Sequence, residues 1–141
     1  MGFPRLDVRL DIVRHNAIEV QALCGKHGID VTGVTKACAG APEIAQAFVS
    51  AGIRRLGDAR IENLKRLEPV SAEKWLIRIP MPAEAEDVVR YADVSLNSEW
   101  DTIRLLDIAA GKQGKLHKVI LMADLGDLRE GYTDADELLA V

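Results

Sequence analysis

The sequence predicts an α/β fold built on a parallel sheet, because short apolar segments of strand length alternate with amphipathic helical segments along the chain. Most of the expected helices also end at a glycine or carry a proline in the first turn, as helices commonly do. Five such strand–helix units suit either a doubly wound sheet or part of a (β/α)8 barrel. Periodicity alone does not separate these two architectures.

The chain opens on RLDVRLD, residues 5–11, a strand that precedes the five units and is followed by a helical segment over residues 11–28. In the strand, apolar residues alternate with charged ones, which is typical of a half-exposed strand. The helix ends in glycine, and its expected apolar face is formed by Val13, Ala17, Val20 and Cys24.

The first of the five units is the strand IDVTGVTK, residues 29–36, and a helix over residues 41–52 with a proline in its first turn. Its apolar face is expected to hold Ile44, Ala47 and Phe48. The second unit joins a strand at 53–59 to a helix at 61–68. Both strands are short and apolar, as buried parallel strands are.

The remaining units run to the end of the chain. A strand at 74–80 precedes a helix at 82–92, whose first turn carries the acidic residues that the helix dipole favours. The next strand is 93–97, and Ser98 with Asp101 resembles a capping box that starts the following helix. The apolar face of that helix is expected to hold Ile103, Leu106 and Ile108, with glycines 111 and 114 at its end. The fifth strand is 117–126, and the last helix is expected over 133–141 with Thr133 as its cap.

Composition excludes several classes of protein. With 141 residues, 48% of them hydrophobic, the chain predicts one soluble domain over residues 1–141. The net charge is −4 and basic residues do not cluster, which argues against nucleic acid as a partner. No segment has the length or the leader pattern of a membrane or secreted protein, so we expect no membrane partner and a cytoplasmic location. Two cysteines outside any CxxC pattern and three scattered histidines predict no metal site.

Polar residues at the ends of the expected strands mark the candidate site. No GxGxxG or GxxxxGK[ST] motif follows a strand, which weakens a nucleotide-binding interpretation. The candidates are Lys36, Asp58, Arg78, Asn97 and Asp124, with Arg129 just beyond the fifth strand.

Each candidate has a plain structural alternative. Lys36 could be a solvated charge, Asp58 could pair with Arg60, Arg78 could pair with an acid, and Asn97 could cap the next helix. The acidic run Asp124, Asp127 and Glu130 lacks the pattern of a calcium loop and predicts a polar loop.

Five segments together resemble the alanine racemase family of fold-type III pyridoxal-phosphate enzymes, and within it the branch of the ornithine racemases. In chain order they are GVTKACAG, LGDARIENL, LIRIPM, DVSLNSE and ILMADLGDLREGY. The similarity extends along essentially the whole chain. It implies a (β/α)8 barrel of the alanine racemase N-terminal domain type, present here over about the first five units. It also implies pyridoxal 5'-phosphate as the cofactor and a small amino acid as the substrate.

The resemblance assigns roles to two residues. Lys36 matches the lysine that forms the internal aldimine and serves as one of two racemising bases. At the mouth of an apolar barrel its amine is expected to lose hydration, which favours the neutral form that attacks an aldehyde. Small neighbours, Gly33, Ala37 and Gly40, leave room for an aromatic ring.

Arg129 aligns with the arginine that bonds toward the phenolic oxygen of the cofactor in this family, where a guanidinium stabilises an anion. Its plain alternative is a surface arginine paired with Glu130. Asp58, Arg78 and Asn97 have no firm counterpart in the family and are expected to line the cofactor site.

Two departures from the family limit the prediction. Gly40 stands where relatives commonly carry a tyrosine that contacts the cofactor phosphate. The resemblance also ends at Val141, before the late strands that build a phosphate site in barrels of this kind and before the domain that supplies the second base. We therefore expect a fragment of a larger barrel, with weak cofactor binding and negligible racemase activity on its own. Unpaired strand edges predict a dimer or higher homo-oligomer.

Two other functions stay open at this point. One is a non-catalytic pyridoxal-phosphate-binding protein that leaves the chirality of amino acids unchanged. The other is an assembly module without cofactor, in which Lys36 is a surface charge. The particular amino acid substrate does not follow from the sequence.

Overall fold

A single parallel sheet organises the computed structural model, which describes residues 4, 6–126 and 128–140. Over these residues the strand order is β1-β2-β3-β4-β5, and each pair of neighbours is parallel. The strands are β1 (Thr32–Val34), β2 (Arg55–Asp58), β3 (Glu73–Leu76), β4 (Val94–Asn97) and β5 (Lys118–Leu121).

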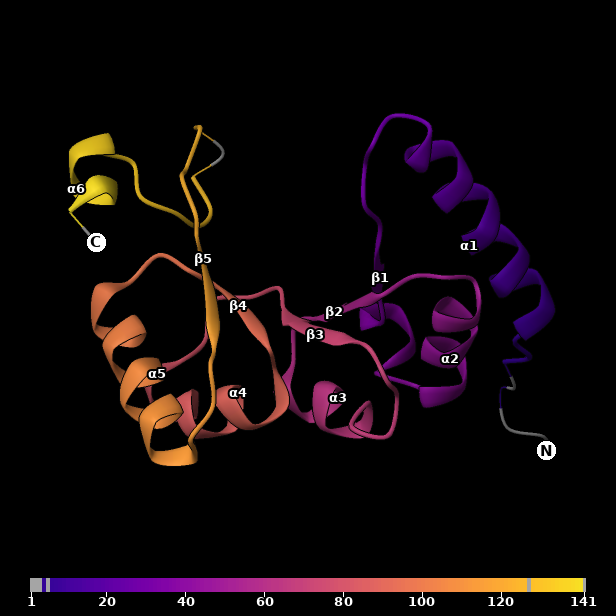
Figure 1. The fold of residues 1–141 in the computed structure, drawn as a ribbon, viewed down its shortest axis with the longest axis horizontal. Coiled ribbons are helices and arrows are strands. Elements are labelled where there is room, and N and C mark those ends of the chain that lie inside the picture. The colour runs from indigo at the N-terminus through magenta and orange to yellow at the C-terminus, as the bar shows by residue number, and fades with distance from the viewer. Residues whose placement is uncertain (1–3, 5, 127, 141) are drawn as a thin grey trace.

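Helices connect each strand to the next. They are α1 (Leu10–Gly25), α2 (Pro42–Ser50), α3 (Ile61–Arg66), α4 (Ala85–Tyr91), α5 (Trp100–Gln113) and α6 (Ala135–Leu139), with short 3-10 turns η1 (Lys36–Cys38) and η2 (Pro82–Glu84). Figure 1 shows α2, α3, α4 and α5 following one another along one side of the sheet, with α1 beside α2. Among the described residues, no helix is long and apolar enough to cross a membrane.

The strand order separates the two architectures that periodicity left open. A doubly wound sheet requires a point where the strand order reverses. Here every described strand lies next to the one that precedes it in the sequence. Because crossover connections are right-handed, this order places the connecting helices on the same side, as in a (β/α)8 barrel. The predicted partial barrel is therefore confirmed.

The core lies between the sheet and the helices. Leu56 of β2 and Leu76 of β3 point into it, and Leu64, Val88 and Leu106 pack there from α3, α4 and α5. Side chains alternate between the two faces of a strand, so residues paired with Leu56 or Leu76 share the helix-facing side. Gly33 is paired with Leu56, and a Cβ at Gly33 would lie 2.7 Å from Cδ2 of Phe48 in α2.

The first predicted strand is wrong. Arg5 lies outside the described residues, residues 6–9 form no strand, and α1 already begins at Leu10. Leu6 is 88% exposed, so the alternation of apolar and charged residues does not mark a buried face. Alternation forms a strand only where a neighbouring strand pairs with it, and the described partner of β1 is β2.

Three predicted details of the helices also differ. In α1, Val20 is exposed and Gln21 takes the inward position, where its Nε2 donates to the carbonyl of Gly52 over 2.9 Å. Glu99, rather than Ser98, precedes α5, and within the described chain its side chain makes no capping bond. Asp134 caps α6 in place of Thr133, accepting from the backbone N–H groups of Asp136 and Glu137.

The predicted apolar faces of two helices are confirmed in part. In α2 Ala47 is buried and Phe48 packs against the core as predicted, and Ala45, which was not predicted, is fully buried. In α5 Ile108 is 49% exposed, while Leu106 and Ala109 are buried.

Candidate functional site

Parallel strands bring the predicted site residues to one edge of the sheet. Lys36 follows β1 after one intervening residue, Asp58 and Asn97 are the last residues of β2 and β4, and Arg78 follows β3 after one residue. Carboxyl ends of parallel strands lie at the same edge, so the structure groups these residues as the sequence pattern predicted. Their side chains nevertheless point in different directions.

Lys36 lies on a short loop, residues 35–40, which we call the lysine loop. The residue starts the 3-10 turn η1, and its side chain is exposed. Within the described part of the chain, the amine has no hydrogen-bond or ion-pair partner. The expected loss of hydration is therefore not found among the described residues, and the amine faces solvent.

Gly40 closes the lysine loop against α3. Its φ is +67°, and a Cβ at this position would lie 2.8 Å from both Cβ and the carbonyl oxygen of Asn63. Side chains rarely adopt that φ, and real Cβ atoms essentially never approach so closely. A tyrosine cannot be accommodated at this position, so the departure from the family noted in the sequence has a structural cause.

Asp58 is fully buried and fixes the lysine loop through a hydrogen-bond network. Its Oδ2 accepts from Oγ1 of Thr35 over 2.7 Å, and Thr35 directly precedes the lysine. Its Oδ1 accepts from the backbone N–H of Arg60 over 3.1 Å and from Nδ2 of Asn63 over 2.9 Å. Both carboxylate oxygens thus accept hydrogen bonds within the protein, and Asp58 holds the residue next to Lys36 in place through Thr35. That it also contacts a cofactor stays a prediction.

Three further bonds hold the same loop. The N–H of Thr35 donates to the carbonyl of Gly57 over 2.9 Å, and Sγ of Cys38 donates to the carbonyl of Thr35 over 3.2 Å. Arg66 of α3 donates to the carbonyl of Ala39 over 3.0 Å. The backbone that carries Lys36 is therefore attached to β2 and to α3, while the lysine side chain is left free.

Asn97 belongs to a second buried network rather than to a helix cap. Its Nδ2 donates to Oγ of Ser95 over 2.9 Å, and Oγ of Ser95 lies 2.8 Å from Nε2 of His117. Nδ1 of His117 lies 3.2 Å from the carbonyl of Ala92, which can only accept, so the proton of a neutral ring lies on Nδ1. Ser95 then donates to Nε2. Oδ1 of Asn97 is buried and has no partner among the described atoms.

Burial governs the titration of His117. Desolvation lowers the pKa of the imidazole, and the charge of Lys115 lowers it further. The backbone bond to Ala92 and the charge of Asp93 act in the opposite direction but are smaller than desolvation. The neutral ring is therefore the form that this network holds.

Arg129 lies on a compact loop between β5 and α6. Ala123 forms a parallel bridge with Tyr132, and Oδ1 of Asp124 accepts from the N–H of Gly126 over 2.7 Å. Gly131 has φ +128°, and a Cβ there would lie 2.6 Å from the N atom of Asp124. Arg129 is exposed at the tip of this loop.

The sequence left two structural alternatives for this loop, an ion pair between Arg129 and Glu130 and a polar loop formed by the acidic run. Within the described residues, no ion pair joins Arg129 to Glu130. Asp127, the middle residue of the acidic run, lies outside the described residues. No group of three or more His, Cys, Asp or Glu side chains that could hold a metal ion occurs in the part of the chain that the structure describes.

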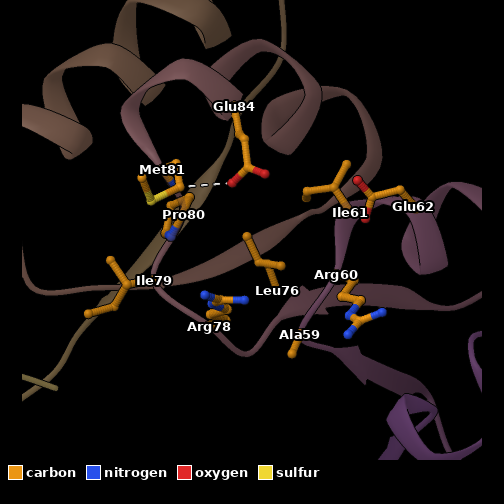
Figure 2. A pocket seen from close by; sticks show the side chains of 10 residues that line it. All are labelled: Ala59, Arg60, Ile61, Glu62, Leu76, Arg78, Ile79, Pro80, Met81 and Glu84. Carbon is orange, nitrogen blue, oxygen red and sulfur yellow. Dashed lines mark hydrogen bonds between the residues drawn. The ribbon is translucent and has the colours of Figure 1, made fainter. Parts of the chain in front are cut away.

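Arg78 lies in a pocket of about 410 Å³ between the loops that follow β2 and β3. Figure 2 shows Ala59, Arg60, Ile61 and Glu62 along one side of this pocket and Arg78, Ile79, Pro80 and Met81 along the other. The lining residues do not include Lys36. The structure thus places Arg78 beside Arg60 at the same sheet edge, and apart from the lysine loop.

The residues present suit part of the expected cofactor. The primary amine of Lys36, which has no partner over the described residues, is the kind of group that reacts with an aldehyde, and Ala37 and Ala39 beside it are small. The guanidinium of Arg129 is suited to a phenolic oxygen that carries negative charge. The lysine loop and the Arg129 loop follow strands at opposite ends of the described sheet.

Sequence reasoning missed the residues that hold the site together. Thr35 and Asn63 bond to Asp58 from two different segments, and His117 lies on the far side of Ser95. A polar residue directly before the candidate lysine was the available signal for Thr35. His117 carried no such signal, because its partners come from another strand.

Comparisons with known proteins find relatives along nearly the whole chain. The family model of the alanine racemase N-terminal domain matches residues 8–141. The chain is 43% identical over 136 residues to an ornithine racemase of Acetoanaerobium sticklandii and 35% identical over 133 residues to a lysine racemase of Thermotoga maritima. These matches cover 96% and 93% of this chain.

Among solved structures, an alanine racemase of Clostridium difficile 630 matches with a TM-score of 0.78 at 20% sequence identity, which is a likeness of fold. The match covers 93% of this chain and 35% of that one. This chain spans 38% of the length of each of the two racemases that it resembles in sequence.

Proposed function

The chain belongs to the alanine racemase N-terminal domain family, and from this premise we propose that it carries the cofactor-binding lysine of a pyridoxal-phosphate-dependent amino acid racemase. Lys36 is the residue that we assign to this role. The observation that supports the assignment is the unpartnered amine of Lys36 on a loop whose backbone is fixed by Asp58 and by α3. Because the backbone is fixed, the start of the Lys36 side chain is already in place when the amine meets an aldehyde.

Pyridoxal phosphate, when bound, supplies an electron sink that stabilises negative charge at the α-carbon of an amino acid. The work of the protein is to place a base beside that carbon. Nζ of Lys36 would hold the aldehyde group of the cofactor and would serve as the base that takes a proton from the α-carbon or returns it. Racemisation also needs a second acid/base group on the other face of that carbon.

Other residues of the site receive supporting roles in this proposal. Arg129 would hold the negatively charged phenolic oxygen of the cofactor through its guanidinium. Asp58 acts through Thr35 and is a positioning residue. Oδ1 of Asn97, at the end of β4, is buried and has no partner among the described atoms, and Arg78 lines the pocket between the loops after β2 and β3.

The proposed substrate is an amino acid with a basic side chain. The two relatives named above are racemases of ornithine and of lysine, and both substrates have a second amino group. We place the reaction in the cytoplasm, where the free thiols of Cys24 and Cys38 would stay reduced. Self-association through the strand edges is also part of the proposal.

Titration with pyridoxal phosphate tests the assignment of Lys36. We expect saturable absorbance at about 420 nm in the unchanged chain and its loss in Lys36→Ala. Free aldehyde also reacts with surface amines, so Lys26→Ala, which removes another exposed lysine, is the matched control and should leave the absorbance unchanged. Equal absorbance in the unchanged chain and in Lys36→Ala would remove Lys36 from the cofactor site.

A second measurement separates racemisation from cofactor binding alone. Optical rotation of enantiopure ornithine should decay only if the bound cofactor is catalytic. A non-catalytic binding protein would show the lysine-dependent absorbance with constant rotation, and an assembly module would show neither. The exposed amine of Lys36 is compatible with a non-catalytic binding protein, because solvent access does not prevent cofactor binding.

A further inference from the structure

The pocket between the loops after β2 and β3 has an apolar floor and a charged rim. Ile61, Leu76 and Pro80 are buried and form the floor. The rim carries two guanidinium groups and two carboxylates, all of them exposed, from Arg60, Arg78, Glu62 and Glu84. A volume of about 410 Å³ is within the range of pockets that bind small molecules, which is roughly 300–1,000 Å³.

Three of the four charged groups on the rim have no partner over the described residues. They are the guanidinium groups of Arg60 and Arg78 and the carboxylate of Glu62, for which no hydrogen bond or ion pair is found there. Glu84 accepts from the backbone N–H of Met81 through Oε2 over 3.1 Å. Figure 2 shows Glu84 and Arg78 on opposite sides of Leu76, so the apolar floor separates charges that would otherwise pair.

We propose that this pocket binds a small aliphatic amino acid that carries a second amino group. The carboxylate of the ligand accepts from Arg78 and Arg60, for which the planar guanidinium provides paired donors. The amino groups donate to Glu84 and Glu62, and the methylene groups lie on Leu76 and Ile61. A zwitterion with opposite charges at the ends of an aliphatic chain matches this arrangement of floor and rim.

The pocket is separate from the amine of Lys36, and its ligand would be held without cofactor. The inference rests on the proposed function for the amino acid class of its ligand, and it adds a second place at the same sheet edge where such a molecule is held. Binding can therefore be measured in the absence of pyridoxal phosphate.

Three probes distinguish the two kinds of contact. We expect L-ornithine to bind the unchanged chain about tenfold more tightly than norleucine, which lacks the terminal ammonium, and than 1,4-diaminobutane, which lacks the carboxylate. Amide NMR shifts should move in residues 59–62 and 78–81. Equal affinity for the three probes, or shifts confined to other segments, would overturn the proposal.

Variants of the rim test the individual contacts. Arg78→Gln should weaken ornithine binding about tenfold, and Arg78→Lys should recover part of that loss because it keeps the charge but not the paired donors. Glu84→Gln keeps an acceptor for Met81 and should narrow the difference between ornithine and norleucine. Arg104→Gln, whose side chain is 62% exposed on α5, should change nothing. A loss of the same size in Arg104→Gln would assign the effect to net charge and not to the pocket.

Lys36→Ala separates this inference from the proposed function. If the pocket is the binding site, this variant binds ornithine with unchanged affinity whether or not the 420 nm absorbance depends on Lys36. If ornithine binding is lost with Lys36, the ligand lies at the lysine loop and the pocket proposal is wrong. Absence of lysine-dependent absorbance alongside intact ornithine binding would reject only the proposed function.

Discussion

Gly40 and Gly28 offer a matched comparison at the scale of single residues. Their φ values are +67° and +68°, but a Cβ at Gly40 would collide with Asn63, while no described atom lies within 4 Å of a Cβ at Gly28. Gly28→Ala therefore meets only the backbone cost of the left-handed conformation, about 1 kcal/mol. Gly40→Ala adds a collision with Asn63.

We expect Gly40→Ala to lower the free energy of unfolding by about 2 kcal/mol more than Gly28→Ala, as overpacking commonly does. Urea denaturation of both variants measures this difference. Equal destabilisation would show that α3 moves away without cost and that the lysine loop is not tightly seated on it.

Asp58 gives a second prediction at this scale. Removing a buried carboxylate that accepts from three donors leaves Thr35 and Asn63 unsatisfied, so Asp58→Ala should lower the free energy of unfolding by about 3 kcal/mol. Asp58→Asn keeps the shape, and the hydroxyl of Thr35 can turn to accept, so its cost should be about 1 kcal/mol. Asp107→Ala on the exposed side of α5 is the control, with a change below about 0.5 kcal/mol.

The same variants test whether Asp58 positions the lysine. If it does, Asp58→Asn should weaken the lysine-dependent absorbance with pyridoxal phosphate, although the protein stays folded and its free energy of unfolding falls by only about 1 kcal/mol. An unchanged cofactor titration in a folded Asp58→Asn protein would limit Asp58 to a structural role.

At the scale of secondary structure elements, His117 links the amino-terminal ends of β4 and β5 through Ser95 and Ala92. Burial lowers its pKa below the ordinary value near 6.5, so the unfolded chain binds a proton more readily than the folded one. Its contribution to stability is complete above about pH 6.5 and is lost as the pH falls through the lower pKa of the folded state.

Urea denaturation at pH 7.5 and pH 5.5 measures this effect. The unchanged chain should lose more stability between the two pH values than His117→Gln, which cannot gain a proton there. His15→Gln, on the exposed side of α1, should behave like the unchanged chain. An identical pH dependence in all three proteins would mean that protonated His117 finds compensation from Asp93.

Element types were predictable from local pattern, while ends and faces were not. The five strands from residue 32 onward and their helices follow from apolar runs and from the glycines and prolines between them. Residues 6–9 carry a strand pattern without a strand beside them, and local sequence does not contain that information. Ser98 and Thr133 are residue types that commonly cap helices. In the structure, however, the residues that directly precede α5 and α6 are their neighbours Glu99 and Asp134.

For the candidate site as well, the positions of the residues were predictable from the sequence and the directions of their side chains were not. Lys36 and the grouping of strand-end residues follow from parallel topology, which the alternation of elements predicts. The direction of each side chain depends on the strand register. Asp58 is paired with Leu76 and therefore points to the same helix-facing side. Ser95 is also paired with Leu76, and Asn97, two residues further along β4, points to that side as well. Register is set between strands, so the buried roles of Asp58 and Asn97 required the structure.

The whole molecule ends in two strand edges over the described residues, β1 on one side and β5 on the other. Four apolar residues of β5 and the preceding helix α5 are each at least 37% exposed: Leu105, Ile108, Val119 and Leu121. Exposed edges with neighbouring apolar side chains favour pairing with another chain.

We therefore expect sedimentation equilibrium to show a mass that rises with protein concentration. Leu121→Lys places a charge on the β5 edge and should shift the distribution toward the monomer. Asp107→Lys on the exposed side of α5 adds charge away from that edge and serves as the control. A monomer at all concentrations in the unchanged chain would exclude association through these edges.

The match between chain order and strand order has a consequence for synthesis of the protein. Each strand from β2 to β5 pairs with the strand made just before it, across one helix and two loops. A nascent chain leaving the ribosome thus meets a partner for each new strand as soon as its βα unit is complete, and the sheet can grow from its amino-terminal side without waiting for distant segments.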